Sequence, residues 1–128
     1  MNTAITQGIQ VSVVTRFEPS HSNPQAKMFI FSYRIRIENK GENTVQLLRR
    51  HWIIYDTNGE IREVEGPGVV GETPTLKPGE SYEYASACDL NSTMGSMEGE
   101  YMMENKDDEQ FFQVVVPNFR MEVPWILN

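Results

Sequence analysis

The sequence has little of what catalysis, metal binding or membrane insertion would require. It holds one cysteine, Cys88, so no disulfide can form within the chain, and neither that residue nor the two histidines, His21 and His51, shows the spacing of a zinc site. Apolar runs are only a few residues long, and residues 1–8 are polar without the pattern of a signal peptide. We therefore expect a cytoplasmic protein that does not bind membranes.

Positive charge is also scarce. The 128 residues contain 11 Lys and Arg against 18 Asp and Glu, which gives a formal net charge of -7 at pH 7. A surface of that sign repels the phosphate backbone, so nucleic acid is not an expected partner. With 39% hydrophobic and 23% charged residues, the composition is that of an ordinary globular protein, and we expect one domain over residues 1–128.

Catalytic motifs are missing as well. Cys88 falls inside an alternating apolar segment without a local nucleophile signature, and no serine sits in a G-x-S-x-G elbow. An enzyme is therefore not expected, and no catalytic residue, metal site or required cofactor is predicted. Glu60, Glu63 and Glu65 could collect a weakly bound Mg²⁺ or Co²⁺, but they lack the spacing of a calcium loop, and a solvated face is the simpler interpretation.

The main pattern in the sequence is an apolar residue at every second position. Apolar side chains occupy the odd positions of residues 29–37 while mostly polar ones fill the even positions, and residues 9–13 alternate in the same way. These segments predict two antiparallel strands, each with one buried face, paired as a hairpin across the polar loop of residues 19–24. No segment carries a sustained helical stripe.

Turn signals divide the middle of the chain. Asn58-Gly59 predicts a type I′ hairpin turn, and a phase change in the apolar pattern predicts a bulge near residues 48–51. Residues 76–80 lead into an alternating strand with Tyr82 and Tyr84. That arrangement resembles the tyrosine corner of immunoglobulin-like sandwiches, in which the hydroxyl bonds to backbone upstream.

Two final strands are expected at Met97–Glu104 and Gln110–Val116, and Pro117 is expected to end the last ladder because it lacks a backbone donor. Seven or eight short strands separated by frequent turns are typical of a sandwich. We therefore predict an all-β, immunoglobulin-like or fibronectin type III-like β-sandwich of two antiparallel sheets.

One loop has the spacing of a phosphate-binding motif. Residues 66–71 match G-x-G-x-x-G, so the backbone amides around Gly66, Gly68, Val69, Val70 and Gly71 could hold a pyrophosphate. The dinucleotide-binding form of this motif also needs a helix directly after the loop, and here Pro74 follows closely instead. The favoured interpretation is that these glycines allow tight bends between two strands, with phosphate binding as the alternative.

Three residues are candidates for binding a protein partner. Arg50 and His51 lie at the predicted bulge together with Arg49, and two guanidiniums beside an imidazole could hold a phosphate or a carboxylate. The simpler alternative is a bulged strand that buries Trp52 and points its charges outward. Trp125 lies near the end of the chain, followed by two aliphatic residues, and it is expected to pack on a sheet or to contact a second chain.

Taken together, many of these residues resemble the ApaG family. The resemblance spans nearly the whole chain and is densest in its middle third. The positions that carry it are Arg50-His51-Trp52-Ile53-Ile54, Asp56, Asn58-Gly59, Val64, Gly66, Gly68-Val69-Val70-Gly71-Glu72, Pro74, Leu76, Pro78-Gly79-Glu80 and Tyr84. The resemblance implies one ApaG domain with a fibronectin type III-like fold, in agreement with the strand pattern.

What the resemblance implies about function points in two directions. Bacterial members are named alongside a diadenosine polyphosphate hydrolase and are linked to cobalt tolerance and magnesium efflux, whereas similar domains in F-box proteins and in a DNA polymerase-interacting protein bind protein partners. We favour a non-catalytic adaptor domain that binds a protein partner. On this interpretation the association with cobalt tolerance and magnesium efflux is indirect. The alternative is a module that binds pyrophosphate or a nucleotide through residues 66–71. Edge strands would also allow a homodimer.

Overall fold

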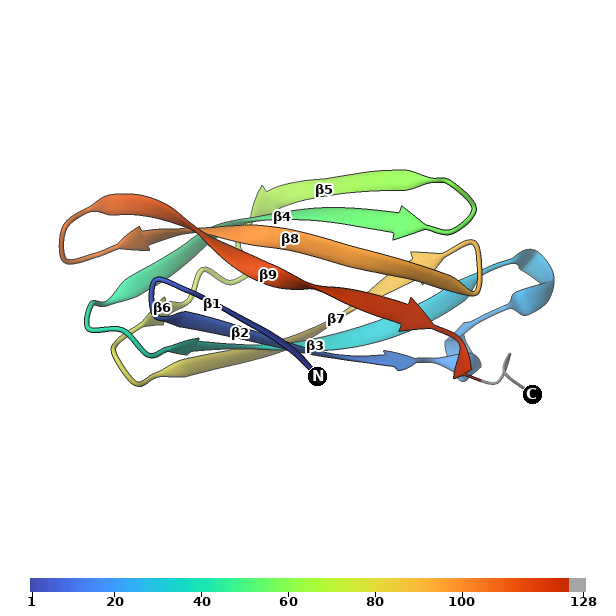
Figure 1. Cartoon of the computed structure of the whole chain (residues 1–128), viewed down its shortest axis with the longest axis horizontal. Helices are drawn as coiled ribbons and strands as arrows, with labels where there is room; N and C mark the ends of the chain where they lie inside the picture. The colour runs from blue at the N-terminus through green and yellow to red at the C-terminus, as the bar shows by residue number, and fades with distance from the viewer. Residues whose placement is uncertain (125–128) are drawn as a thin grey trace.

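The structure is a computed structural model that describes residues 1–124 as a sandwich of two antiparallel β-sheets (Figure 1). The first sheet has the order β1-β2-β3-β7, and the second has the order β5-β4-β8-β9 with β6 paired to β4. The strands are β1 Asn2–Thr6, β2 Ile9–Phe17, β3 Phe29–Asn39, β4 Val45–Asp56, β5 Ile61–Pro67, β6 Thr75–Leu76, β7 Ser81–Leu90, β8 Met94–Asn105 and β9 Gln110–Glu122. The predicted all-β sandwich is confirmed, with nine strands in this part of the chain instead of seven or eight.

The core lies between the two sheets because each strand turns its apolar positions inward. In β3 the odd residues from Phe29 to Asn39 are buried. Trp52 from β4 is the aromatic centre of the core, with edge-to-face contacts to Tyr33, Tyr101 and Phe119 at centroid distances of 5.8, 6.3 and 6.0 Å. Pairs of this geometry contribute about 0.5–1.5 kcal/mol each beyond their buried area. The aromatic cluster therefore ties β3 of the first sheet to β4, β8 and β9 of the second.

The hairpins are largely where the sequence places them. β2 pairs with β3 as predicted, and the loop between them contains two short 3₁₀ turns, η1 Pro19–His21 and η2 Pro24–Ala26. β1 was not predicted. It pairs with β2 across a tight turn at Gln7 and Gly8, whose φ values of 47° and 82° are both positive.

The turn at Asn58-Gly59 does join β4 to β5, but its predicted type is wrong. A type I′ turn needs positive φ at both central residues. Only Gly59 is in that region, with φ of 98°. The loop spans four residues and closes with a 2.9 Å hydrogen bond from the Asp56 N–H to the Glu60 carbonyl, so Asn58 is free to use its side chain. The Asn58 amide oxygen accepts from the Glu60 N–H at 2.9 Å.

Two bulges decide which way side chains point. The predicted bulge in β4 is confirmed: the register against β8 shifts between Leu47 and Arg49. It brings Arg50 into phase with the buried Trp52. A second shift between β8 and β9 lies at Met97 and Gly99, opposite Pro117. The prediction that Pro117 ends the last ladder is wrong, because a proline at a bulge removes no ladder hydrogen bond and β9 continues to Glu122.

The two long sides of the sandwich differ. On the side nearest the viewer in Figure 1, β1 and β2 pack against β9. Side chain to backbone hydrogen bonds join them: Asn2 Nδ2 to the Asn118 carbonyl at 2.7 Å, the Val115 N–H to Thr6 Oγ1 at 3.1 Å, and Thr15 Oγ1 to the Arg120 carbonyl at 3.4 Å. We call this side the closed seam.

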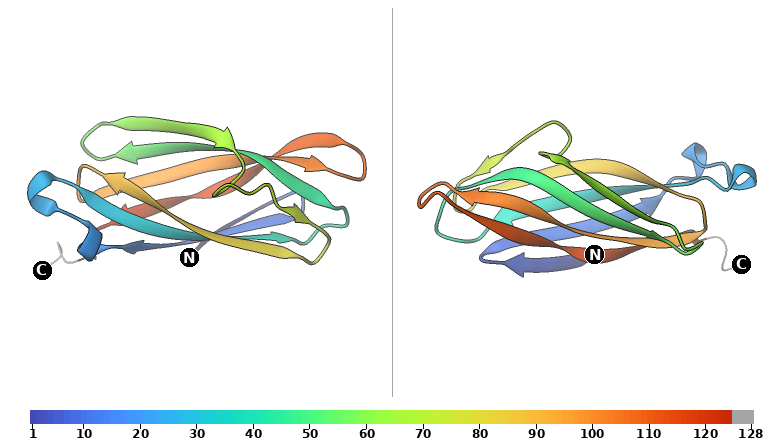
Figure 2. Two further views of the ribbon diagram at one scale, coloured as in Figure 1. Left: turned by 180° about the vertical axis from the view of Figure 1, so that it is seen from behind. Right: turned by 90° about the horizontal axis from the view of Figure 1, so that it is seen from above.

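On the opposite side, β5 and β7 are the sheet edges, and they face the viewer in the left view of Figure 2. In the described residues, β5 pairs only with β4 and β7 pairs only with β3. The backbone groups on the outer side of each strand are therefore left without a strand partner. We call this side the open seam.

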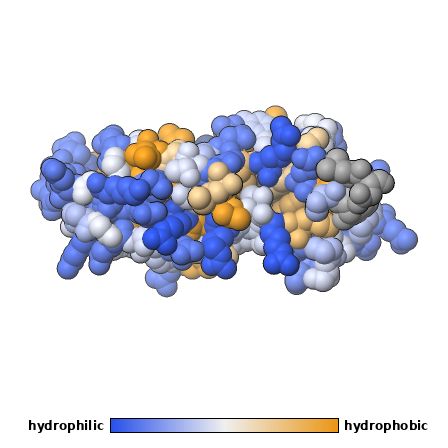
Figure 3. All heavy atoms as spheres, turned by 60° about the horizontal axis from the view of Figure 1, so that its bottom comes forward, coloured by the Kyte–Doolittle hydropathy of each residue, from blue (hydrophilic) through white to orange (hydrophobic). Residues whose placement is uncertain are grey.

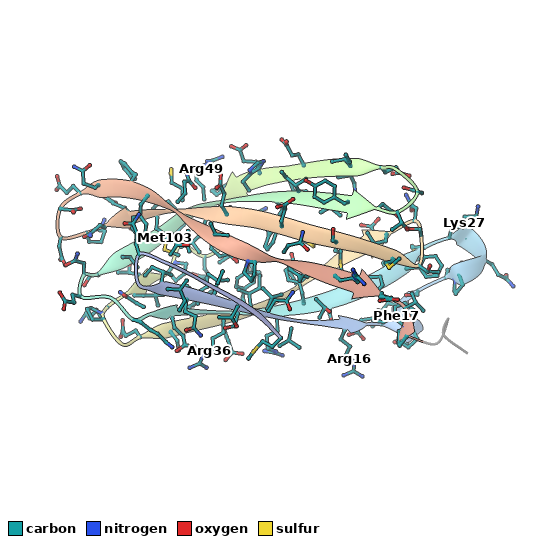
Figure 4. All side chains as sticks on the ribbon, in the orientation of Figure 1. Arg16, Phe17, Lys27, Arg36, Arg49 and Met103 are labelled. Carbon is teal, nitrogen blue, oxygen red and sulfur yellow. The ribbon has the colours of Figure 1, made fainter. Side chains whose placement is uncertain are left out.

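Charged and polar side chains cover much of the surface of the sandwich, although some apolar ones, such as Val14 and Phe111, are exposed. Figure 3 shows a mostly hydrophilic surface with separate hydrophobic areas. Arg16 and Arg36 point away from the first sheet (Figure 4), and Arg36 pairs with Glu38 at 3.1 Å and with Glu83 at 3.4 Å. Exposed ion pairs of this kind contribute little to stability. Within residues 1–124 the structure has no helix of the length and apolarity that a membrane crossing needs.

Candidate functional site

A pocket of about 350 Å³ opens between the two sheets at the open seam. This volume lies in the lower part of the range of small-molecule sites. Its walls are built from β3, β4, β5, β7, β8 and the loop after β5. The lining residues are Tyr33, Arg50, Trp52, Ile54, Arg62, Val64, Val69, Val70, Tyr84, Ser86, Ala87, Cys88, Asp89 and Met97.

Arg50 reaches the pocket because the bulge in β4 turns it inward and because its neighbour in β5 has no side chain. Arg50 pairs with Gly66 in the β4–β5 ladder. A Cβ atom built on Gly66 would lie 3.2 Å from Arg50 Nη1, so the guanidinium extends across the glycine toward the open seam. Nη1 donates to the carbonyls of Pro67 at 2.9 Å and Gly68 at 3.1 Å. The guanidinium is therefore held in one orientation by the loop.

The nitrogen atoms of this guanidinium differ in their hydrogen bonding. Both N–H groups of Nη1 are engaged by the loop carbonyls, whereas in residues 1–124 Nε and Nη2 of Arg50 make no hydrogen bond to protein. The described residues contain no side-chain nitrogen or oxygen that is both buried and unpaired, so these two donors are accessible. Among the ion pairs of that same part of the chain, Arg49 pairs with Glu65 and Arg62 with Asp89, but Arg50 has no carboxylate partner.

Arg62 closes the opposite end of the pocket. It projects from β5 to β7, where Nη1 contacts Asp89 Oδ1 at 3.2 Å and Nη2 donates to the Asp89 carbonyl. The same Nη2 lies 3.7 Å from the Cys88 sulfur. Arg62 is therefore neutralised locally, and the positive charge left without a counterion in the pocket is that of Arg50.

The ionisable hydroxyl and thiol groups of the pocket stay protonated. Burial raises the pKa of Cys88 to about 11, and burial also raises the pKa of Tyr33 and of Tyr84. Tyr84 shares a 2.5 Å hydrogen bond with the Tyr101 hydroxyl. That contact runs across the core to the other sheet. Within residues 1–124 neither the Tyr82 nor the Tyr84 hydroxyl bonds to upstream backbone, so the predicted tyrosine corner is wrong. At neutral pH these groups donate hydrogen bonds and supply no general base.

The glycine-rich loop forms the rim of the pocket. Val69 and Glu72 exchange backbone hydrogen bonds of 2.8 and 3.0 Å around a tight turn at Val70 and Gly71, and the Gly68 N–H donates to the Leu48 carbonyl at 2.8 Å. Two of the amides that a pyrophosphate would need, those of Gly68 and Val69, are thus already used. Pyrophosphate binding here stays a prediction, with little geometric support.

Val70 is strained. Its φ of 48° lies in the left-handed region, which a β-branched residue rarely adopts, and its side chain is 62% exposed at the pocket mouth. A strained, exposed apolar residue beside a pocket is a candidate for binding, since strain of about 1–3 kcal/mol persists only where the surrounding structure holds it. Val64 of β5 is also exposed at this mouth.

The other predicted residues lie elsewhere. His51 points to the outer face of the second sheet, where Nε2 is 3.5 Å from Glu63, so it does not line this pocket. His51 and Arg50 do meet at a smaller cavity of about 170 Å³, which Arg49 and Glu65 also line. In Figure 4, Arg49 also lies on this outer side. The described residues contain no group of three or more His, Cys, Asp or Glu that could hold a metal ion. Trp125 lies outside the described residues.

Within residues 1–124, the fold and the pocket define a class of protein: an antiparallel β-sandwich with one closed seam and one open seam, whose pocket holds an arginine, Arg50, without a carboxylate partner. The ApaG domain family matches residues 19–105. The chain is 49% identical over its full 128 residues to the whole of protein ApaG from Anaeromyxobacter dehalogenans. It is 44% identical over 126 residues to protein ApaG from Methylocella silvestris, covering 98% of this chain and 96% of that one.

A solved structure agrees with these relatives. The putative ApaA protein from Bordetella pertussis superimposes with a TM-score of 0.87 at 39% identity, over 91% of this chain and 94% of the other. The chain belongs to the ApaG family. The family match begins within the β2–β3 loop and ends with β8, whereas β1, β2 and β9 of the sandwich lie beyond it. The extent of the domain over residues 1–128 stays a prediction.

Proposed function

We propose that this protein is a non-catalytic adaptor that binds a protein partner at the open seam between β5 and β7. The observation that carries the proposal is the asymmetry of the two seams. Side chain to backbone hydrogen bonds cover the β1–β9 side. The β5–β7 side combines unpaired strand edges, a pocket and exposed apolar side chains. Edges of this kind pair with extended peptides, and a neighbouring pocket supplies specificity.

The chemistry of the pocket supports binding over catalysis. Its tyrosine and cysteine side chains are held protonated, and its one carboxylate, Asp89, is engaged by Arg62. A catalytic site needs a group that exchanges protons near neutral pH or an activated nucleophile. The pocket instead offers a fixed set of hydrogen-bond donors and apolar walls, which is what recognition of a partner side chain requires.

The family's link to cobalt tolerance and magnesium efflux is, on this proposal, carried by the partner. The alternative, a module for pyrophosphate or a nucleotide, has weaker support because the loop turns its carbonyls toward Arg50 and uses two of its amides internally. A partner in the cytoplasm fits the net charge of -7 and the single cysteine.

A display library of random peptides, selected on the immobilised protein, tests the proposal with a matched pair of variants. Val64→Glu places a charge at the open seam, and Val115→Glu places the same charge at a similarly exposed valine of β9 on the closed seam; their side chains are 38% and 49% exposed. We expect Val64→Glu to abolish capture of the selected peptides and Val115→Glu to retain it. Peptides that ignore Val64→Glu, or that require Val115, would place binding elsewhere and refute the proposal.

A further inference from the structure

The hydrogen bonds of Arg50 leave one defined edge of its guanidinium for a ligand. Nη1 is used by the loop carbonyls, and Nε and Nη2 are the accessible donors. These two atoms carry parallel N–H bonds on the same side of the planar group. A carboxylate accepts such a pair with both oxygens at once, and bidentate pairing is stronger and more directional than a single hydrogen bond.

We propose that this edge is a receptor for an acidic side chain, Asp or Glu, of the partner segment that docks at the open seam. The inference rests on the proposed function and adds the chemistry of its anchor. The acidic residue would enter over Gly66, where no side chain of β5 stands between Arg50 and the seam. Its carbon stem would contact the apolar rim of Val64 and Val70.

The charge balance of the site favours a carboxylate over a phosphate group. Arg50 offers one unpaired positive charge, and the other guanidinium of the pocket, Arg62, is already paired with Asp89. A phosphate group carries about −1.5 to −2 charges at pH 7 and is usually held by several arginines. In a chain of net charge -7 a second negative charge would find no counterion here. A monoanion matches the site.

The outer side of β5 adds a second preference. Glu63 and Glu65 point outward from this strand and contact His51 and Arg49 of β4. Side chains alternate in direction along a strand, so a partner strand beside β5 turns every second residue toward the pocket and the others toward these glutamates. The expected partner segment therefore alternates: an acidic residue between apolar ones faces inward, and basic residues face outward.

The arginine Nε–H signal in ¹H–¹⁵N NMR spectra reads the receptor directly. Isobutyrate, a carboxylate on a short apolar body, is titrated into the full chain beside isobutyramide, which has the same shape without the charge. We expect the Arg50 signal to shift saturably with isobutyrate, with at least tenfold weaker binding of isobutyramide. The signal of Arg49, on the outer face and paired with Glu65, serves as the internal control and should not respond.

Two further arms decide the ligand class. Arg50→Lys keeps the charge but cannot form the two parallel bonds, so carboxylate binding, read at the amides of Ser86 and Val70, should weaken about tenfold. Inorganic phosphate should bind no more tightly than isobutyrate. An Arg50 signal that ignores both isobutyrate and isobutyramide, responds equally to them, or prefers phosphate would overturn the assignment. The wild-type comparison decides the question even if Arg50→Lys does not fold.

The adaptor proposal and the carboxylate receptor fail separately. If display-selected peptides depend on Val64 while the Arg50 signal ignores carboxylates, docking at the open seam stands and the acidic anchor is wrong. If Arg50 binds isobutyrate but no selected peptide depends on Val64, the site takes a small carboxylate and the adaptor proposal is wrong. Association of the chain with itself through the same edge would appear as a dimer in sedimentation and would also count against a separate partner.

Discussion

Replacing Gly68 by alanine should destabilise the fold far more than replacing Gly71, although both glycines lie in one loop at positive φ, 61° and 79°. A Cβ atom at Gly68 would collide with the Glu72 carbonyl oxygen and lie 3.3 Å from Thr73 Cγ2, whereas one at Gly71 meets nothing within 4 Å. Both alanines incur the left-handed backbone term of about 1–2 kcal/mol. Only Gly68→Ala must also move the chain.

The size of the extra term follows from the bonds that would break. Displacing the Glu72 carbonyl removes the hydrogen bond it accepts from Val69, and moving Gly68 removes its bond to the Leu48 carbonyl; each is 2.8 Å long. A backbone hydrogen bond contributes about 0.5–1.5 kcal/mol, so two lost bonds add about 1–3 kcal/mol. We therefore expect Gly68→Ala to cost about 2–5 kcal/mol in total and Gly71→Ala only the backbone term of about 1–2 kcal/mol.

Urea unfolding followed by circular dichroism measures both changes. The midpoints should separate while the slope m stays constant, because the surface exposed on unfolding is the same. Equal losses for the two variants would show that close packing at Gly68 is not what the motif provides. That result would favour a ligand-binding role for the glycines.

Three further predictions concern the pocket walls and the core. Val70→Asn should raise the free energy of unfolding by about 1 kcal/mol, because asparagine tolerates the left-handed region, and should weaken capture of the display-selected peptides; a loss of stability would refute the strain at this position. Tyr84→Phe leaves the Tyr101 hydroxyl buried without a partner and should cost about 1–3 kcal/mol. Adding Tyr101→Phe should recover part of that loss, and strict additivity in the double-mutant cycle would show that the hydroxyl pair is not coupled. Burial raises the pKa of Cys88 from 9.0 to about 11, so the folded state keeps a proton that the unfolded state releases. Stability should therefore be full below about pH 9 and fall above it by up to about 1.4 kcal/mol per pH unit, and Cys88→Ala should flatten the fall between about pH 9 and pH 10 in urea titrations.

The strands that the sequence predicts correctly are those with one solvent-exposed face and one buried face. The alternation in residues 29–37 fixes β3, and Asn58-Gly59 fixes the hairpin of β4 and β5. β1 gives no such signal, because its residues lie at a sheet edge and Ile5 is 63% exposed. Pro117 misleads because a proline ends a ladder or sits at a bulge, and pairing with β8 decides between the two.

The pocket could not be predicted because its parts are distant in sequence and its key residue depends on one register shift. Residues 48–51 predict a bulge, but only its position at Leu48 places Arg50 in phase with Trp52 and directs it inward. A bulge after Arg50 would have turned it to solvent. The sequence motif G-x-G-x-x-G suggests phosphate binding, but the structure gives the first glycine another role. Gly66 is needed because the Arg50 guanidinium packs against it from the neighbouring strand, and that contact cannot be read from the spacing of the glycines.

The most direct test of the account is an amide chemical-shift map of the labelled protein with a display-selected peptide. We expect saturable shifts along β5, residues 68–72 and β7, with Arg50 Nε–H among the shifted signals and the β1–β9 side unchanged. Shifts concentrated on β1 and β9, with β5 and β7 silent, would contradict docking at the open seam.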